Sequence, residues 1–128
     1  MRMDFKRLHH VAIIASDYQK SKEFYTQVLG LEIIRENYRA ERESYKLDLK
    51  IGESEIELFS FPNPPKRFSS PEAAWLRHLC FYVEDIHQAV AELNRKGIET
   101  ESIRRDEYTG GLFTFFRDPD DLPIELHE

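Results

Sequence analysis

The chain of 128 residues has the size of one ordinary domain. Its 18 Lys and Arg residues are outnumbered by 24 Asp and Glu residues, and the net charge of −6 argues against nucleic-acid binding, which needs clustered basic groups. Because the sequence has a single cysteine, no apolar run long enough for a membrane helix and no apolar leader, we expect a cytoplasmic protein with neither disulfides nor a membrane partner.

The first half of the chain predicts a strand, a helix and then three strands. Residues 8–15 are apolar and β-branched, as in a strand, and Asp17 can cap a helix that runs to about Val28 and stops at Gly30. The three strands expected after this helix cover residues 32–36, 45–51 and 55–61, with Gly52 in the turn between the last two.

The second half predicts the same order of elements after a proline-rich stretch, residues 62–74. A strand over 76–83 precedes a helix that begins after Asp85 and ends at Gly97. Further strands are expected at 100–104, 112–117 and 123–127. We therefore predict a single α+β domain over residues 1–128, built from two tandem βαβββ modules at about 7–61 and 75–128.

Two His and two Glu residues repeat in register between the modules. A constant offset in residue number relates His10 to His78 and Glu57 to Glu125 (78 − 10 = 68 and 125 − 57 = 68). Side chains alternate along a strand, and each of these four lies on the face opposite the purely aliphatic or Phe-rich positions. If the strands curl around a hollow, two imidazoles and two carboxylates point into it.

This set of side chains suits a metal ion. Two neutral imidazoles and two carboxylates carry a formal charge of −2, which a divalent cation neutralises, and imidazole with carboxylate suits several transition metals. We therefore predict that His10, Glu57, His78 and Glu125 bind one divalent ion, with Zn, Ni, Co or Mn all compatible. Other polar groups are interpreted as structural: His9 is expected to point with Val11 toward the helix, and Cys80 to be an unreactive small side chain.

The same residues sit in motifs that cover essentially the whole chain. These motifs are Leu8-His10 with Asp17, Phe24-Tyr25 with Leu29-Gly30-Leu31, Ile56-Glu57-Leu58, Arg77-His78-Leu79, and Asp118-Pro-Asp followed by Ile124-Glu125-Leu126. They resemble the glyoxalase/bleomycin-resistance/extradiol-dioxygenase superfamily, the vicinal oxygen chelate fold, and within it a small glyoxalase I-like bacterial branch. The resemblance implies a cupped mixed β-sheet around a metal, and usually a homodimer, with the site built within one chain or across two.

The resemblance also implies a reaction. A metal-dependent lyase or isomerase of this kind binds a small oxygen-chelating substrate and passes through an enediolate, with Glu125, or Glu57 as the symmetric candidate, moving the proton. Bacterial glyoxalase I has glutathione-holding Arg and Asn residues where this chain has Ile14 and Phe61, so the glutathione contacts are expected to be non-standard. The residues predicted to contact substrate are Ile14, Phe59, Phe61 and Tyr82 as an apolar wall, then Tyr45 and Lys46, with Arg39 and Tyr108 as weaker candidates.

Two other functions fit the same scaffold. An extradiol dioxygenase or a fosfomycin-type thiol transferase would use two His and one carboxylate, here His10, His78 and Glu125, and the fourth donor Glu57 counts against it. A metal-free protein that sequesters a drug or other small molecule would not need the intact donor set.

Overall fold

The computed structural model describes residues 2–128 and divides into two compact units, one up to Pro65 and the other from Lys66 to Glu128. The division falls inside the proline-rich stretch that separates the predicted modules. Over residues 2–128, no helix has the length and apolar character required to cross a membrane.

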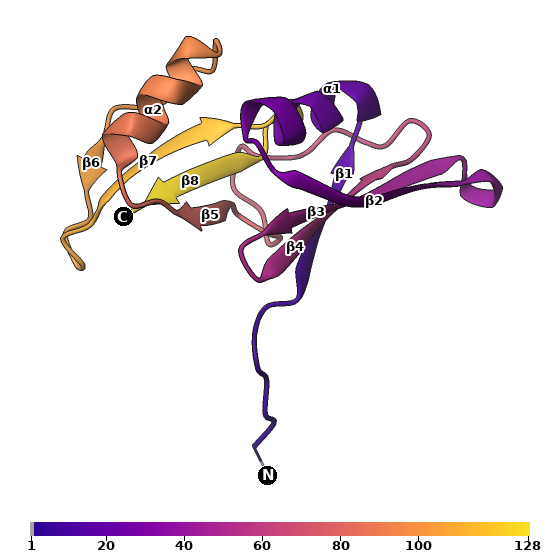
Figure 1. Ribbon diagram of the computed structural model, residues 1–128, viewed down its shortest axis with the longest axis horizontal. Helices are drawn as coiled ribbons and strands as arrows, with labels where there is room; N and C mark the ends of the chain where they lie inside the picture. Colours follow the sequence, from indigo (N-terminus) through magenta and orange to yellow (C-terminus); the bar gives the residue numbers. More distant parts are fainter. Residues whose placement is uncertain (1) are drawn as a thin grey trace. The chain divides into compact units, whose positions relative to one another are not determined.

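The first unit is a four-stranded mixed sheet with one helix over it (Figure 1). The strand order is β1-β4-β3-β2, with β1 parallel to β4 and the other neighbours antiparallel. Its elements in chain order are β1 (His10–Ala15), α1 (Tyr18–Glu23), β2 (Glu32–Arg39), β3 (Ser44–Ile51) and β4 (Ser54–Ser60).

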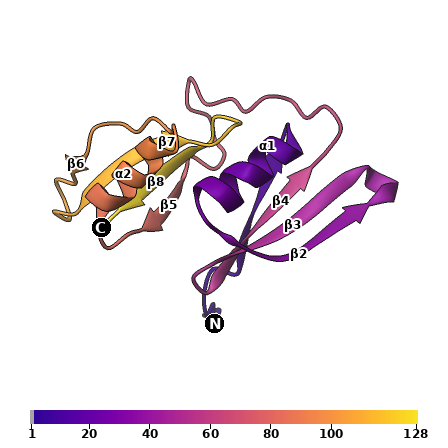
Figure 2. The ribbon, with the colours of Figure 1, turned by 45° about the horizontal axis from the view of Figure 1, so that its top comes forward.

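The second unit repeats this arrangement, with α2 over its own sheet (Figure 2). The strand order is β5-β8-β7-β6, and again the first pair is parallel and the others are antiparallel. Its elements are β5 (Leu79–Tyr82), α2 (Ile86–Arg95), β6 (Arg104–Arg105), β7 (Leu112–Arg117) and β8 (Pro123–His127). The prediction of two βαβββ modules with mixed sheets is confirmed.

The register of the parallel strands reproduces the sequence repeat. Ala12 pairs with Glu57 in the first unit, and Cys80 pairs with Glu125 in the second. The offset between the modules is the same for both members of the pair (80 − 12 = 68 and 125 − 57 = 68). The two glutamates therefore occupy equivalent positions in their sheets.

Each unit has its own apolar core between the helix and one sheet face. The alternating strand residues Ile13, Leu58, Ile124 and Leu126 are buried, while the side chains between them stay accessible on the opposite face. Burial of these aliphatic side chains stabilises each unit by about 25 cal/mol per Å² of apolar surface removed from water. The helix-covered face is thus the structural face, and the other face is left for a site.

The helices begin where the sequence predicts but differ in how they end. Asp17 and Asp85 accept hydrogen bonds from the amides of Lys20 and Gln88, both at 3.1 Å. The first helix does run to Val28 as predicted, but its type changes: after Glu23 the chain forms a π-helical turn, in which the Leu29 amide donates to the Phe24 carbonyl at 3.0 Å.

The strands predicted over 76–83 and 100–104 are much shorter in the structure. β5 begins at Leu79, opposite Ile124 near the start of its partner β8, and the Arg67 guanidinium binds the carbonyls of Leu76 and Arg77 just before it (2.6 and 3.2 Å). The strand predicted over 100–104 is reduced to Arg104–Arg105, where regular pairing with β7 occurs. Before β6, the Glu101 carbonyl accepts a hydrogen bond from the Thr114 hydroxyl at 2.7 Å. A side chain thus supplies the donor that a backbone amide of the neighbouring strand would supply in a regular sheet.

Candidate functional site

His10 and Glu57 lie side by side in the first unit. The parallel pairing sets Ala12 opposite Glu57, so His10, two residues earlier on the same strand face, lies diagonally across from the carboxylate. His10 Nε2 lies 3.6 Å from Glu57 Oε2, and the side chains are 41% and 15% exposed. This pair is on the face opposite the buried Ile13 and Leu58.

His78 and Glu125 form the equivalent pair in the second unit. His78 Nε2 lies 3.1 Å from Glu125 Oε1, and the side chains are 25% and 13% exposed. The rings of His78 and Phe115 pack edge to face, with their centroids 5.2 Å apart. Nδ1 of His78 is buried and forms no hydrogen bond within residues 2–128.

The donor spacing in each pair fits a shared metal ion. Two donors about 2.1 Å from one ion, at bond angles of about 90–110°, are about 3.0–3.4 Å apart. The observed separations of 3.6 and 3.1 Å are close to this range. Within neither unit, over residues 2–128, do three His, Cys, Asp or Glu side chains gather to hold a metal. Each unit thus contributes two donors, and the convergence of all four stays a prediction.

Glu57 belongs to a charged network that the motif analysis missed. Across the strand it faces Asp48, which is fully buried and pairs with Arg35 Nε at 2.6 Å and Lys46 Nζ at 2.7 Å. Lys46 Nζ also lies 3.7 Å from Glu57 Oε2. The alternation of residues 45–51 contained this signal, because Lys46 and Asp48 alternate with the apolar Leu47 and Leu49.

Glu125 has a different environment from Glu57. Across the strand it faces Phe115 rather than an acid, and within residues 2–128 its one ion pair is with His78. It also influences Cys80: partial burial, followed by the charge and hydrogen bonding of Glu125, raises the pKa of that thiol to about 11. The two carboxylates are therefore equivalent in register but not in their surroundings.

The predicted apolar wall is partly assembled within the first unit. Ile14 pairs with Phe59 across the parallel strands and is 52% exposed, and the Phe59 and Phe61 rings stack 6.0 Å apart. The Arg39 guanidinium lies 4.9 Å from the Phe59 centroid. Tyr82 belongs to the second unit, opposite His127 on β8, and is 74% exposed.

Other candidates from the sequence lie elsewhere. Tyr45 stacks on Tyr18 of α1 at 4.4 Å and so lies on the helix side of its sheet, away from the Glu57 face. Tyr108 is 90% exposed on a loop. The expectation that His9 points inward is wrong: it is exposed, and its Nδ1 lies 3.0 Å from that of His10.

Comparisons with known proteins agree with this architecture. A family model described as the Glyoxalase/Bleomycin resistance protein/Dioxygenase superfamily matches residues 7–126. YwkD of Bacillus subtilis (strain 168), described as an uncharacterized protein, is 61% identical over 127 residues, which cover 98% of this chain and 99% of YwkD. The crystal structure of the glyoxalase family protein from Enterococcus faecalis has a TM-score of 0.91 and 56% identity, covering 98% of this chain and 100% of that chain.

Two more distant proteins have names that state a reaction. The mitochondrial methylmalonyl-CoA epimerase of Bos taurus is 29% identical over 133 residues, covering 95% of this chain and 74% of that protein. The lactoylglutathione lyase of Agrobacterium tumefaciens has a TM-score of 0.74 at 21% identity, covering 98% of this chain and 96% of that chain, and this likeness supports the fold alone.

Proposed function

Because the chain belongs to the Glyoxalase/Bleomycin resistance protein/Dioxygenase superfamily, we propose that it is a divalent-metal-dependent lyase or isomerase of the glyoxalase I-like type. Its substrate would be a small molecule with two neighbouring oxygens and an acidic C–H bond beside a carbonyl group. The observation that carries this proposal is the pair of equivalent His–Glu contacts, at 3.6 and 3.1 Å, on the accessible sheet faces.

In this proposal His10, Glu57, His78 and Glu125 hold one Zn, Ni, Co or Mn ion. When bound, the ion supplies Lewis-acid stabilisation of negative charge that develops on the substrate oxygens. The four donors require neutral imidazoles and ionised carboxylates, so metal affinity should fall as the pH drops and these groups are protonated.

We assign proton transfer to Glu125. One oxygen of Glu57 is shared between His10 and Lys46, whereas within residues 2–128 Glu125 has no Lys or Arg within ion-pair distance. Glu125 is therefore the carboxylate that is less engaged by other side chains and freer to reach a proton of the substrate. Glu125 also lies beside Phe115, which helps to exclude water from its proton.

The name of the distant epimerase supports this reaction class but not one substrate. Epimerisation of a centre beside a carbonyl group removes a proton and returns it, which is the step assigned to Glu125. The apolar Ile14 and Phe61, where bacterial glyoxalase I has glutathione anchors, favour a thiol other than glutathione or a thiol-free substrate.

The test is an activity screen of metal-reconstituted protein, beginning with methylglyoxal plus assorted thiols. Glu125→Gln should reduce turnover by about 100-fold or more, because positioned acid–base catalysis contributes at least that much. Glu84→Gln, an exposed change in the same unit, is the matched control and should keep full activity. Full activity in Glu125→Gln would overturn the assignment.

Two other outcomes would favour the rival functions. Iron-dependent oxygen uptake with a catechol would indicate a dioxygenase. Protein purified without an affinity tag that holds less than about 0.1 equivalent of metal, and rebinds none, would indicate a sequestering protein.

We also propose a homodimer as the functional assembly, with a cytoplasmic location. Sedimentation equilibrium should give twice the mass of one chain. The mass of a single chain at every protein concentration tested would contradict the dimer.

A further inference from the structure

A cavity of about 410 Å³ lies in the second unit, beside the His78–Glu125 pair. This volume is in the range of small-molecule sites. His78 itself contributes to the lining, as do the aromatic side chains Phe68, Trp75 and Phe115. The remaining charged residues of the lining are Arg67, Arg77, Arg104, Arg117, Glu72 and Glu101.

The side chains that line this cavity carry a net positive charge, whereas the whole chain is acidic. The lining contains four arginines against two glutamates, while the whole protein has a net charge of −6. An acidic protein that gathers guanidinium groups around a concave site concentrates positive potential there, because low-dielectric walls focus the field. The lining side chains therefore carry an excess of positive charge, although the carboxylates of Asp121 and Glu125 lie next to it.

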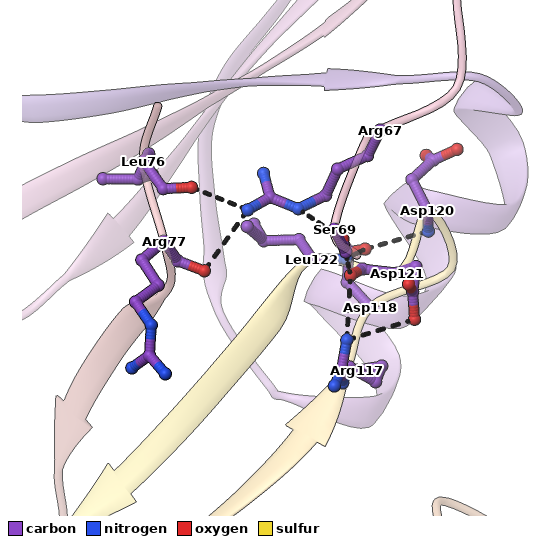
Figure 3. A network of polar contacts seen from close by, with 9 residues as sticks. All are labelled: Arg67, Ser69, Leu76, Arg77, Arg117, Asp118, Asp120, Asp121 and Leu122. Carbon is purple, nitrogen blue, oxygen red and sulfur yellow. Dashed lines mark hydrogen bonds and ion pairs between the residues drawn. The ribbon is translucent and has the colours of Figure 1, made fainter. Parts of the chain in front are cut away.

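The wall of the cavity is held in place by hydrogen bonds (Figure 3). Arg67 spans the loop before β5, binding the carbonyls of Leu76 and Arg77, and its Nε donates to Ser69 at 3.0 Å. Ser69 in turn donates to the Asp121 carbonyl at 3.3 Å, which ties the loop to the turn between β7 and β8. The loop is therefore positioned before any ligand arrives.

The four arginines differ in how strongly other protein groups bind their guanidinium groups. Arg67 uses its donors on the loop, and Arg77 is paired with Glu72. Within residues 2–128, the polar contacts of Arg117 are long, at 3.5 and 3.4 Å to the Asp121 carbonyl and carboxylate oxygens, and its side chain is 48% exposed. Arg104 is held by Glu101 at 2.7 Å and lies over the Phe113 ring at 4.9 Å.

We propose that this cavity binds an anionic oxygen group, a carboxylate or a phosphate, carried by the substrate, with Arg117 and Arg104 as its direct contacts. Guanidinium groups bind both kinds of anion through paired N–H donors. Assigning the anion to the substrate rests on the proposed function, because His78 links the cavity to the donor pair. Binding of the anion itself does not depend on it.

The single tryptophan of the chain, Trp75, reports on this cavity alone. Its fluorescence is followed while metal-free full-length protein is titrated with malonate, with inorganic phosphate and with the neutral malonamide, at constant ionic strength. Malonate or phosphate should give a saturable change and malonamide none, and the stronger of the two anions identifies the group. No saturation with either anion, or an equal response to malonamide, would overturn the proposal.

Arginine variants locate the binding. Arg117→Gln and Arg104→Gln should each weaken anion binding by about tenfold or more, as expected for loss of a charged hydrogen bond. Arg95→Gln removes an exposed, Glu-paired arginine of the same unit that is outside the cavity, and should bind as the parent protein does. If Arg117→Gln and Arg104→Gln both bind like Arg95→Gln, the proposal is wrong.

Turnover separates this inference from the proposed function. With an active anionic substrate, Arg117→Gln should raise KM more than it lowers kcat, because Arg117 would bind the substrate without taking part in the proton transfer. Anion binding in a protein without metal-dependent turnover would retain the cavity and overturn only the proposed reaction. Turnover without anion binding would retain the reaction and overturn the cavity assignment.

Discussion

Residues that share a sheet position can differ in what they are able to do. Glu57 and Glu125 stand at equivalent points of two similar sheets, yet one faces the buried Asp48 and the other faces Phe115. The cross-strand neighbour sets the environment of each glutamate, because side chains directly opposite each other on one sheet face are in contact. This asymmetry is why we assign the proton transfer to only one of them.

The Tyr18–Glu36 contact gives a prediction for the acidic range of pH. The Tyr18 hydroxyl, and then Lys22, hold the pKa of Glu36 below its ordinary value. A lowered folded-state pKa adds stability above the unfolded-state value, and this stability is lost as the pH falls through the folded-state value. Tyr18→Phe should therefore raise the Glu36 pKa and flatten the dependence of stability on pH between about 5 and 3.

Carbon-detected NMR titration of the Glu36 carboxyl group measures this pKa directly. Tyr38→Phe is the matched control, because Tyr38 is on the same strand as Glu36 and is exposed. An unchanged Glu36 pKa in Tyr18→Phe would show that the hydroxyl does not hold the carboxylate.

At the scale of the element, both helices depend on an aspartate at their N-terminus. Asp85→Ala and Asp17→Ala remove the side-chain oxygens that accept from Gln88 and Lys20. Each should lower the free energy of unfolding by about 0.5–2 kcal/mol, the usual cost of losing such a cap. Urea unfolding gives the values, with the exposed Glu84→Ala as the control for Asp85. Losses no greater than that of the control would contradict the capping role.

The turn between β2 and β3 contains a residue whose backbone conformation favours glycine. Glu43 is exposed with φ of +47°, where a side chain is disfavoured. Glu43→Gly should raise the free energy of unfolding by up to about 1 kcal/mol, since the strain removed exceeds the added freedom of the unfolded chain.

Glu41→Gly lies in the same turn without a positive φ and is the matched control. It should be destabilising, because there the glycine relieves no strain and adds only unfolded-state entropy. Thermal unfolding compares the two variants, and equal effects would show that the backbone conformation is not the cause.

At the scale of the whole molecule, we propose that the two donor pairs serve one ion. If they do, calorimetric titration should give one metal ion for each two His–Glu pairs, and Glu57→Gln should weaken binding as severely as Glu125→Gln. Each loss should exceed the roughly 10–100-fold that removal of an outer-shell partner costs. Two independent ions, each sensitive to only one of the substitutions, would show that the pairs act separately.

Much of the fold could be predicted from local patterns. The apolar alternation predicted β1, β4 and β8 within two residues of their bounds, and Asp17 and Asp85 marked both helix starts correctly. The errors arose where a side chain competes with backbone pairing. The Arg67 guanidinium binds the carbonyls just before β5, and no local pattern reveals that contact.

The sequence by itself determined the repeat, the register of the His and Glu residues and the face on which they lie, because strand alternation is a local property with a period of two residues. Only the tertiary structure decided that each His touches its Glu, that Lys46 and Asp48 surround one carboxylate, and that four arginines gather beside His78. Those contacts join residues far apart along the chain, and cross-strand pairing and loop packing bring them together.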